Sequence, residues 1–239
     1  TIEPNVGIVP VPDPRLEKLH ALYSSDNIVP TSIRFVDIAG LVKGASNGEG
    51  LGNQFLAHIR EVDAILHVVR CFEDENVTHV EGKVDPVADV GTIHTELCLK
   101  DLDTVQKRLD RAQKQAKGGD QKEKAAIALC QRLVTHLDQG KPARSAEVQS
   151  DTEREILREM ALLTAKPTFY VAKVDDASVT KVHATPHYRA LVQLAHRAQE
   201  RHDAVGDEHQ VGAEVLLDVA HVVGRELGHR ATDLPLEAG

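Results

Sequence analysis

The sequence is poor in cysteine and has no apolar run of membrane length. Its three cysteines, Cys71, Cys98 and Cys130, form no cluster with metal-ligand spacing, and the odd number offers no complete disulfide framework. Because Cys71 ends an apolar segment and the others lie in helical patterns, all three are expected to be buried thiols. The first residues also lack the charged and apolar regions of a secretion signal, so we expect a cytoplasmic protein with no membrane partner.

Positive charge is also scarce. The 28 lysine and arginine residues stand against 37 aspartate and glutamate residues, which gives a net charge of −9. This balance argues against a generally basic surface and against DNA as a partner, but it leaves room for a local basic patch. With 239 residues and 41% apolar content, the chain is long enough for one sizeable core plus an appendage.

A third absence concerns phosphate binding. The sequence contains no G-x-x-x-x-G-K-[ST] motif, the loop whose backbone amides and lysine hold the phosphates of a nucleotide. The segments Gly40 to Lys43 and Gly140-Lys141 lack the paired glycine spacing of such a loop.

The most informative segment that is present runs from Phe35 to Asp74. Its pattern predicts a strand over 33–38 that delivers Asp37 and Gly40 to its carboxyl end, where open α/β sheets bind ligands. In the D-x-x-G arrangement the aspartate holds magnesium through its shell and the glycine N–H reaches the terminal phosphate. A glycine-rich loop, a helix from Leu51 and a second apolar strand over 64–69 follow.

These motifs resemble those of the Obg-related P-loop GTPases, and within them the YchF or Obg-like ATPase branch. The resemblance is carried by four segments, TIEPNVGIVPVPDPRL (1–16), GASNGEGLGNQFL (44–56), HVVRCFED (67–74) and AKGGD (116–120). It extends to about Val174. It implies an α/β fold, a partial P-loop NTPase (Ras-like) parallel sheet, with 33–38, 64–69 and 168–174 as neighbouring parallel strands.

The resemblance also implies site residues. Thr1 matches a switch threonine, so Thr1 and Asp37 would contact Mg²⁺ bound with ATP or GTP, and Gly40 would sense the phosphate. Leu41 stands where Ras-type GTPases place a glutamine that orients water. His79 is then the best polar candidate for that catalytic role, because an imidazole can hold water or accept its proton near neutral pH; a structural or solvated histidine is the alternative.

The family opens with the strand, phosphate loop and first helix that this sequence lacks. We therefore expect a chain truncated before Thr1, in which nucleotide binding is weak because the phosphate cradle is absent.

From residue 86 to 165 the pattern changes from sheet to helix. Two seams of apolar residues at steps of three and four flank Gly118-Gly119, which predicts an antiparallel helical hairpin, a coiled-coil arm, over Ile93–Leu137. The hairpin is either purely structural or a docking arm that meets ribosomal RNA or protein. The second reading rests on a basic cluster consisting of Lys107, Arg108, Arg111, Lys114, Lys117, Lys122 and Lys124.

The family motif that frames the base, N-x-x-E, is altered here. Aligned on TFYVAKVDD, it places Lys173 at the asparagine and Asp176 at the glutamate, with Val174 beside them. Lysine has no acceptor and cannot reproduce the amide's paired donor and acceptor. Base recognition by Lys173, Val174 and Asp176 is therefore in doubt.

The expected organisation has three parts. Residues 1–85 and 166–177 form a partial nucleotide-binding domain, 86–165 a helical insertion, and 178–239 a divergent tail with no recognisable TGS domain. The composition of the tail fits a different reading frame or a splice onto foreign sequence, and real divergence would also produce it. We expect the tail to pack less well than the segment before it, with local helices such as 188–201.

Three functions stay open. The first is a YchF-type nucleotide switch that hydrolyses ATP or GTP slowly and is linked to the ribosome or to translation. The second is a ribosome-, RNA- or protein-binding helical module without hydrolysis. The third is an inactive, incomplete gene product.

Overall fold

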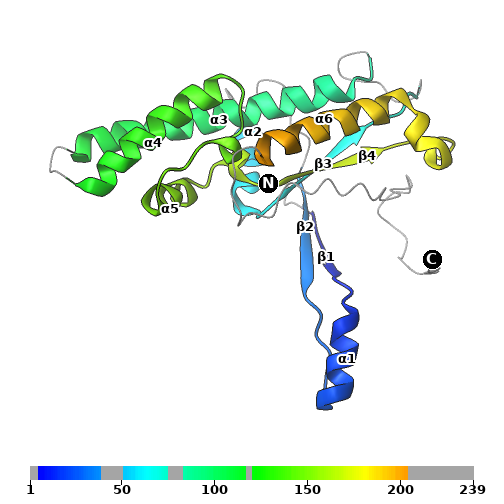
Figure 1. The fold of residues 1–239 in the computed structure, drawn as a ribbon. Coiled ribbons are helices and arrows are strands. Elements are labelled where there is room, and N and C mark those ends of the chain that lie inside the picture. Colours follow the sequence, from blue (N-terminus) through cyan, green and yellow to red (C-terminus); the bar gives the residue numbers. More distant parts are fainter. Residues whose placement is uncertain (1–4, 39–50, 75–82, 117–119, 204–239) are drawn as a thin grey trace. The chain divides into compact units, whose positions relative to one another are not determined.

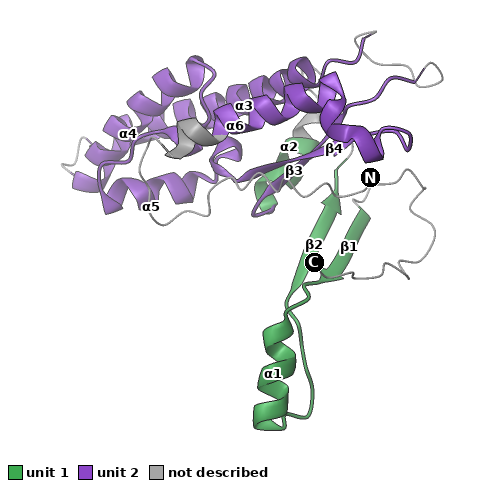
Figure 2. Cartoon of the chain, turned by 45° about the vertical axis from the view of Figure 1, so that its right-hand side comes forward, with its two compact units in different colours: residues 1–61 green, residues 62–239 purple. Residues whose placement is uncertain are grey.

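The fold is an α/β arrangement of two compact units, residues 1–61 and residues 62–239 (Figure 2). The computed structural model describes residues 5–38, 51–74, 83–116 and 120–203. Each unit is described by itself.

Unit 1 is built on a pair of antiparallel strands. Strand β1 (Asn5–Pro10) pairs with β2 (Ser32–Asp37), and the register joins Asn5 to Asp37 and Pro10 to Ser32. Helix α1 (Pro14–Tyr23) lies in the connection between the strands, and α2 (Leu51–Glu61) follows later in the chain. We expected 33–38 to be a neighbour of 64–69 and 168–174, but among the described strands β2 pairs with β1, in the antiparallel direction, and β3 pairs with β4.

Helix α1 begins at an aspartate cap followed by a proline. The Asp13 side chain accepts from the Arg15 N–H at 2.9 Å, and Pro14 occupies the first turn, where its missing N–H costs nothing. The Arg15 guanidinium also binds Asp13 and lowers the pKa of that carboxyl to about 2. No residue of α1 is buried, and Leu22 and Tyr23 are 76% and 79% exposed, so its apolar face has no cover within unit 1.

Unit 2 contains the parallel strand pair. Strand β3 (Ile65–Arg70) pairs with β4 (Thr168–Lys173) in parallel, as predicted for these two segments. One face of the pair is covered by α3 and by α6 (Pro186–Asp203), and there Val69, Cys71 and Leu191 form a buried cluster.

The other face of β3 is open. Leu66 and Val68 are 46% and 54% exposed, although so apolar a strand is typical of burial on both faces. The reason is that the described sheet has only two strands with helices packed on one side, whereas a continuous apolar run is the pattern of a strand covered on both.

The helical arm is the hairpin that the sequence predicts. Helix α3 (Pro86–Gln115) and α4 (Gln121–Asp138) lie side by side along their length and are joined by five residues, which makes them antiparallel (Figure 1). Asp85 caps α3 by accepting from the Val87 and Ala88 N–H groups. The seam between the helices is fully buried and consists of Val105, Ala112, Ala126, Leu129 and Leu133. The turn at Gly118-Gly119 lies outside the described residues.

A further helix, α5 (Asp151–Met160), braces α4. One half of a capping box is present, since the Glu153 N–H donates to Ser150 Oγ at 3.2 Å. The Glu153 carboxylate accepts instead from the Gln149 N–H at 2.8 Å and pairs with Arg132 of α4 at 2.6 Å. Short 3₁₀ turns, Ala143–Ser145, Leu163–Ala165 and Val179–Ala184, complete the unit.

A buried carboxylate ties the arm to the start of β4. Asp101 of α3 is fully buried and accepts from the Leu163 N–H at 2.8 Å, the Thr164 N–H at 2.7 Å and Thr164 Oγ1 at 2.7 Å. The Thr164 hydroxyl oxygen also accepts from the Ala143 N–H at 2.8 Å. The 3₁₀ turn before β4 is therefore held against the middle of α3.

Residues 178–203 pack better than expected for foreign sequence. Helix α6 contacts both α3 and β4, and Tyr188, Leu191 and Ala195 are 7%, 3% and 2% exposed. The predicted local helix over 188–201 is thus part of the core of unit 2, because its apolar residues at steps of three and four meet the inner face of β3–β4. Residues 204–239 lie outside the described part of the chain.

All three cysteines are buried and unpaired, as the sequence predicts. Burial raises the pKa of Cys71 to about 11, that of Cys98 to about 12 and that of Cys130 to about 11. These thiols are therefore protonated and unreactive near neutral pH. Within the described ranges, no helix is long and apolar enough to cross a membrane.

Replacing Asp101 by alanine tests the tie between arm and strand. Three donors would lose their buried acceptor, so we expect the free energy of unfolding to fall by about 3 kcal/mol. Urea unfolding followed by circular dichroism measures this loss. Asp103→Ala, which removes only the exposed ion pair with Lys107, should cost about 0.5 kcal/mol or less; equal losses in the two variants would contradict the assignment.

His67 on β3 predicts a pH dependence of stability. Burial lowers its pKa in the folded state below the ordinary value of 6.5. Below pH 6.5 the unfolded chain binds a proton that the folded chain excludes, so stability present above that pH is lost as the pH falls toward the folded pKa. His67→Phe should therefore flatten the decline in melting temperature from about pH 7 to pH 5, and an unchanged decline would contradict it.

Candidate functional site

The first candidate residue, Asp37, closes β2 of unit 1. It is exposed and lies opposite Asn5 in the strand register. Its place at the carboxyl end of a strand is the one that the D-x-x-G pattern predicts. Thr1 and Gly40, which the resemblance pairs with Asp37, lie outside the described residues, and so does His79.

The second group of candidates lies at the carboxyl end of β4 in unit 2. Lys173 is the last residue of the strand and is exposed, and Asp176 is exposed as well. Val174 is half-buried and packs against the cluster beneath the sheet. Lys173, Val174 and Asp176 therefore lie at the carboxyl end of β4.

Arg70 shares this end of the sheet and was not predicted from the sequence. In the parallel register Arg70 of β3 is the partner of Lys173, and the Cys71 N–H donates to the Lys173 carbonyl at 2.8 Å. Two cations therefore stand side by side where the strands end. Only the pairing of two strands that are about 100 residues apart in the sequence reveals this neighbour.

The Arg70 side chain also holds the segment that follows β3. Its guanidinium lies over the Phe72 ring, 4.8 Å from the ring centroid, and its Nε donates to the Phe72 carbonyl at 2.9 Å. One residue after Phe72, Oε1 of Glu73 lies 3.3 Å from Nε2 of His187 in α6. The strand end is thus fixed to its own loop and to the first turn of α6.

Asp175 is a second residue that motif matching missed. Its carboxylate accepts from the Ser178 N–H at 2.8 Å and from Ser178 Oγ at 2.9 Å. This closes a turn just after β4 and leaves Asp176 as the exposed carboxylate. The spacing D-x-x-S was the available signal, since aspartate and serine commonly bond neighbouring backbone in turns.

The two basic side chains at this strand end can only donate hydrogen bonds. Lysine and arginine offer only N–H groups, so the edge formed by Arg70 and Lys173 has no side-chain amide to present a donor and an acceptor together. Asp176 can accept from an N–H group. The site therefore differs from an asparagine-based pocket for a nucleotide base, as the sequence suggested.

By themselves the residues present do not fit a nucleoside triphosphate. The sequence contains no phosphate loop and no lysine placed by one, and Asp37 is the single described member of the phosphate- and magnesium-contacting set. No group of three metal-ligating side chains occurs among the described residues. No hydrolytic step can be derived from this donor set.

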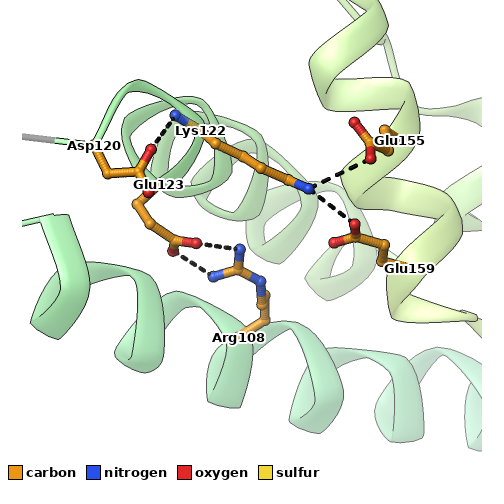
Figure 3. A network of polar contacts seen from close by, with 6 residues as sticks. All are labelled: Arg108, Asp120, Lys122, Glu123, Glu155 and Glu159. Carbon is orange, nitrogen blue, oxygen red and sulfur yellow. Dashed lines mark hydrogen bonds and ion pairs between the residues drawn. The ribbon is translucent and has the colours of Figure 1, made fainter.

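The basic arm is less cationic than its sequence suggests. Arg108 is bound by Glu123 through two hydrogen bonds of 2.7 and 3.0 Å, and both side chains are largely buried. Lys122 pairs with Glu159 at 2.9 Å and with Glu155 at 3.5 Å, which joins α4 to α5 (Figure 3). Lys107 pairs with Asp103 on the surface, and Lys117 lies outside the described residues.

Comparison with known proteins places these features in a family. The family described as "50S ribosome-binding GTPase" matches residues 13–100. The chain is 51% identical to the "Ribosome-binding ATPase YchF" of Escherichia coli O157:H7 over 176 residues, which are 74% of this chain and 48% of that protein. It is 44% identical to the protein of the same name from Bacillus subtilis over 226 residues, 95% of this chain and 60% of the relative.

The match to the Bacillus protein includes most of residues 178–239, because it covers 95% of the chain. The likeness therefore continues beyond Val174, where we expected it to end, which agrees with the packing of α6.

The fold agrees with these matches. A solved structure, "Structure of the Schizosaccharomyces pombe YchF GTPase", superimposes with a TM-score of 0.64 at 36% sequence identity, over 87% of this chain and 55% of that one. The chain spans about half the length of the curated relatives that it matches. It belongs to the YchF/Obg-like family of P-loop nucleotidases.

Proposed function

We propose that this chain is the switch-and-arm portion of a YchF-type nucleotidase, which binds ATP or GTP and couples the nucleotide to a ribosomal partner. The observation that carries the proposal is Asp37 at the carboxyl end of β2, exposed and followed by the rest of D-x-x-G. In this reading unit 1 senses the phosphate and the α3–α4 arm of unit 2 meets the partner.

The nucleotide contacts are assigned by residue. Asp37 and Thr1 would hold Mg²⁺, and the Gly40 N–H would contact the terminal phosphate. A bound Mg²⁺ neutralises phosphate charge, which is the chemistry that such an ion supplies in this class. These 239 residues contain no phosphate loop, so we expect them to bind a nucleotide weakly by themselves.

His79 remains the proposed water-positioning residue, since Leu41 has no polar group for that role. Lys173, Val174 and Asp176 mark the place of the base. Lys173 and its strand neighbour Arg70 offer hydrogen-bond donors but no acceptor. This supports the proposal that the chain recognises the base weakly.

We also propose boundaries for the nucleotide domain and the arm. Residues 1–85 and 166–177 would form the partial nucleotide domain, and 86–165 the inserted arm. The observed bounds of α3, α4 and α5 support the insertion, since all three lie between β3 and β4 in the sequence. The packing of α6 supports extending the nucleotide domain past residue 177.

The ribosomal partner follows from the names of the relatives, which include "Ribosome-binding ATPase". Co-sedimentation of this chain with purified ribosomes tests it. We expect the chain to pellet with ribosomes at low salt, and deletion of the outer part of the arm, residues 106–127, closed by a short glycine-serine linker, to abolish pelleting while Val90 and Asp101 stay in place. A chain that stays in the supernatant at low salt would contradict the partner.

The chain alone should bind nucleotide poorly. Without a phosphate loop most of the amide donors and the phosphate-directed lysine are missing, so we expect no saturable binding of Mg·ATP or Mg·GTP at high-micromolar concentration in calorimetry. Tighter, magnesium-dependent binding would contradict this expectation.

Restoring a phosphate loop tests the switch assignment itself. A fusion that places the strand, phosphate loop and first helix of the Bacillus subtilis relative before Thr1 should bind Mg·nucleotide. Asp37→Asn in that fusion should weaken magnesium-dependent binding by about tenfold, or about 1.4 kcal/mol, because the amide cannot supply the anionic ligand. Asp26→Asn is the matched control and should have no effect; equal losses would remove Asp37 from the site.

A further inference from the structure

Two exposed side chains of opposite charge lie at the carboxyl end of β4. Lys173 is the last residue of the strand, and Asp176 follows it by three positions. Among the residues that the structure describes, neither side chain has a hydrogen-bond or ion-pair partner. This strand end therefore presents a cation and a carboxylate that a ligand can reach from solvent.

Asp176 lies in a turn that its neighbours close. The Ser178 N–H donates to the Asp175 carbonyl at 3.1 Å, and it also donates to the Asp175 carboxylate at 2.8 Å. The Ser178 hydroxyl donates to the same carboxylate at 2.9 Å. The backbone of Asp176 is thus fixed while its side chain stays exposed. A carboxylate on a fixed backbone loses less freedom when it binds a ligand.

Lys173 is placed by the pairing of β3 with β4. Its partner in the parallel register is Arg70, and register partners project from the same face of a sheet. The Arg70 guanidinium lies over the Phe72 ring, so the positive charge beside Lys173 is fixed in position. A ligand group that carries an acceptor is therefore favoured next to Lys173, and one that carries only donors is disfavoured.

We propose that the carboxyl end of β4 binds guanine in preference to adenine, through Lys173 and Asp176. Guanine has adjacent N1–H and N2–H donors, and both oxygens of a carboxylate can accept from such a parallel pair. It also carries the acceptors O6 and N7, to which a lysine ammonium can donate. The inference rests on the proposed nucleotide-binding function and specifies the nucleotide as one with a guanine base.

Adenine complements these two side chains less well. Its amino group stands where guanine has O6, so it would meet the Lys173 ammonium with N–H facing N–H. If adenine turns its amino group to Asp176 instead, it gives the carboxylate one hydrogen bond in place of two, because its N1 carries no hydrogen. The missing hydrogen bond to a charged group, in an exposed site, corresponds to about a fivefold preference for guanine.

The lysine makes this strand end more selective than an asparagine would. An asparagine amide has both a donor and an acceptor, so it could donate to guanine O6 or accept from the adenine amino group. The Lys173 ammonium can only donate. The altered family motif therefore narrows the choice of base, while it removes an acceptor that would strengthen binding.

The test uses the whole chain and the 5′-monophosphates GMP, IMP and AMP, which share ribose and phosphate and differ only in the base. Titration at millimolar concentration, followed by the NMR shifts of the ¹⁵N-labelled chain, gives the three affinities. We expect GMP to bind about fivefold more tightly than AMP. IMP, which keeps O6 and N1–H but lacks the N2 amino group, should lie between them.

Asp176→Asn should lower the affinity for GMP to that for AMP, because an amide has one acceptor oxygen and opposes a guanine donor with its own donor. Lys173→Asn should bring the ratio of GMP to AMP affinity below about two, since the amide accepts from adenine as well. The matched control is Asp138→Asn, which removes the same charge as Asp176→Asn from an exposed position at the end of α4 and should leave the ratio unchanged. Circular dichroism should show all three variants folded, because the three side chains are exposed.

The guanine preference would be overturned by equal affinities for GMP and AMP, by tighter binding of AMP, by no binding of GMP in the millimolar range, or by equal losses in Asp176→Asn and Asp138→Asn. The fusion that carries a phosphate loop separates this inference from the function on which it rests. If the fusion binds Mg·ATP and Mg·GTP equally well, the nucleotide function stands and the guanine preference is wrong. If it binds neither nucleotide, the nucleotide function itself is wrong.

Discussion

A buried carboxylate on α3, Asp101, connects the helical arm to the parallel strand pair. It accepts three hydrogen bonds from the turn that leads into β4, and the Thr164 hydroxyl extends the contact to Ala143. A charge that is fully buried is tolerated only when its hydrogen bonds are satisfied, so this geometry permits little variation. The direction of β4 and the base of the arm are therefore set together.

The Asp101 contact links the long helix α3 to the strand pair of unit 2. Helix α3 has 30 residues and is about 45 Å long, and it begins at the cap formed by Asp85, close in sequence to the end of β3. The same helix carries Asp101 at its middle and the exposed cations Lys107, Arg111 and Lys114 in its second half. Asp101 holds the turn that precedes β4, so the start of this strand and the arm are joined through packed, hydrogen-bonded elements.

Some cations of the arm are held in ion pairs and others are exposed, and a count of charges does not distinguish them. Arg108 and Lys122 satisfy acids within the arm and between α4 and α5, so they stabilise the hairpin and are withdrawn from binding. Arg111 and Lys114 are exposed on the surface of α3. In the same way, Arg70 and Lys173 form a cationic strand end only because β3 and β4 pair in register.

The sequence by itself determined the local elements and the family. Asp13, Asp85 and Ser150 start their helices because their side chains accept from the first free N–H groups, and the D-x-x-G strand end and the quoted motifs indicate a P-loop nucleotidase. The helical hairpin followed from seams at steps of three and four. These are short-range properties, fixed by residues within a few turns of one another.

Only the tertiary structure decided which strands pair, which face of β3 stays open, and where residues 178–203 pack. Each of these depends on contacts between residues far apart in the chain, such as Asp101 with Thr164 and Leu191 with the cluster around Val69. Periodicity gives the face that a segment can bury but not the surface that it meets. For that reason the sequence predicted β2 as a parallel neighbour and α6 as a loose tail, whereas β2 pairs with β1 and α6 completes the core of unit 2.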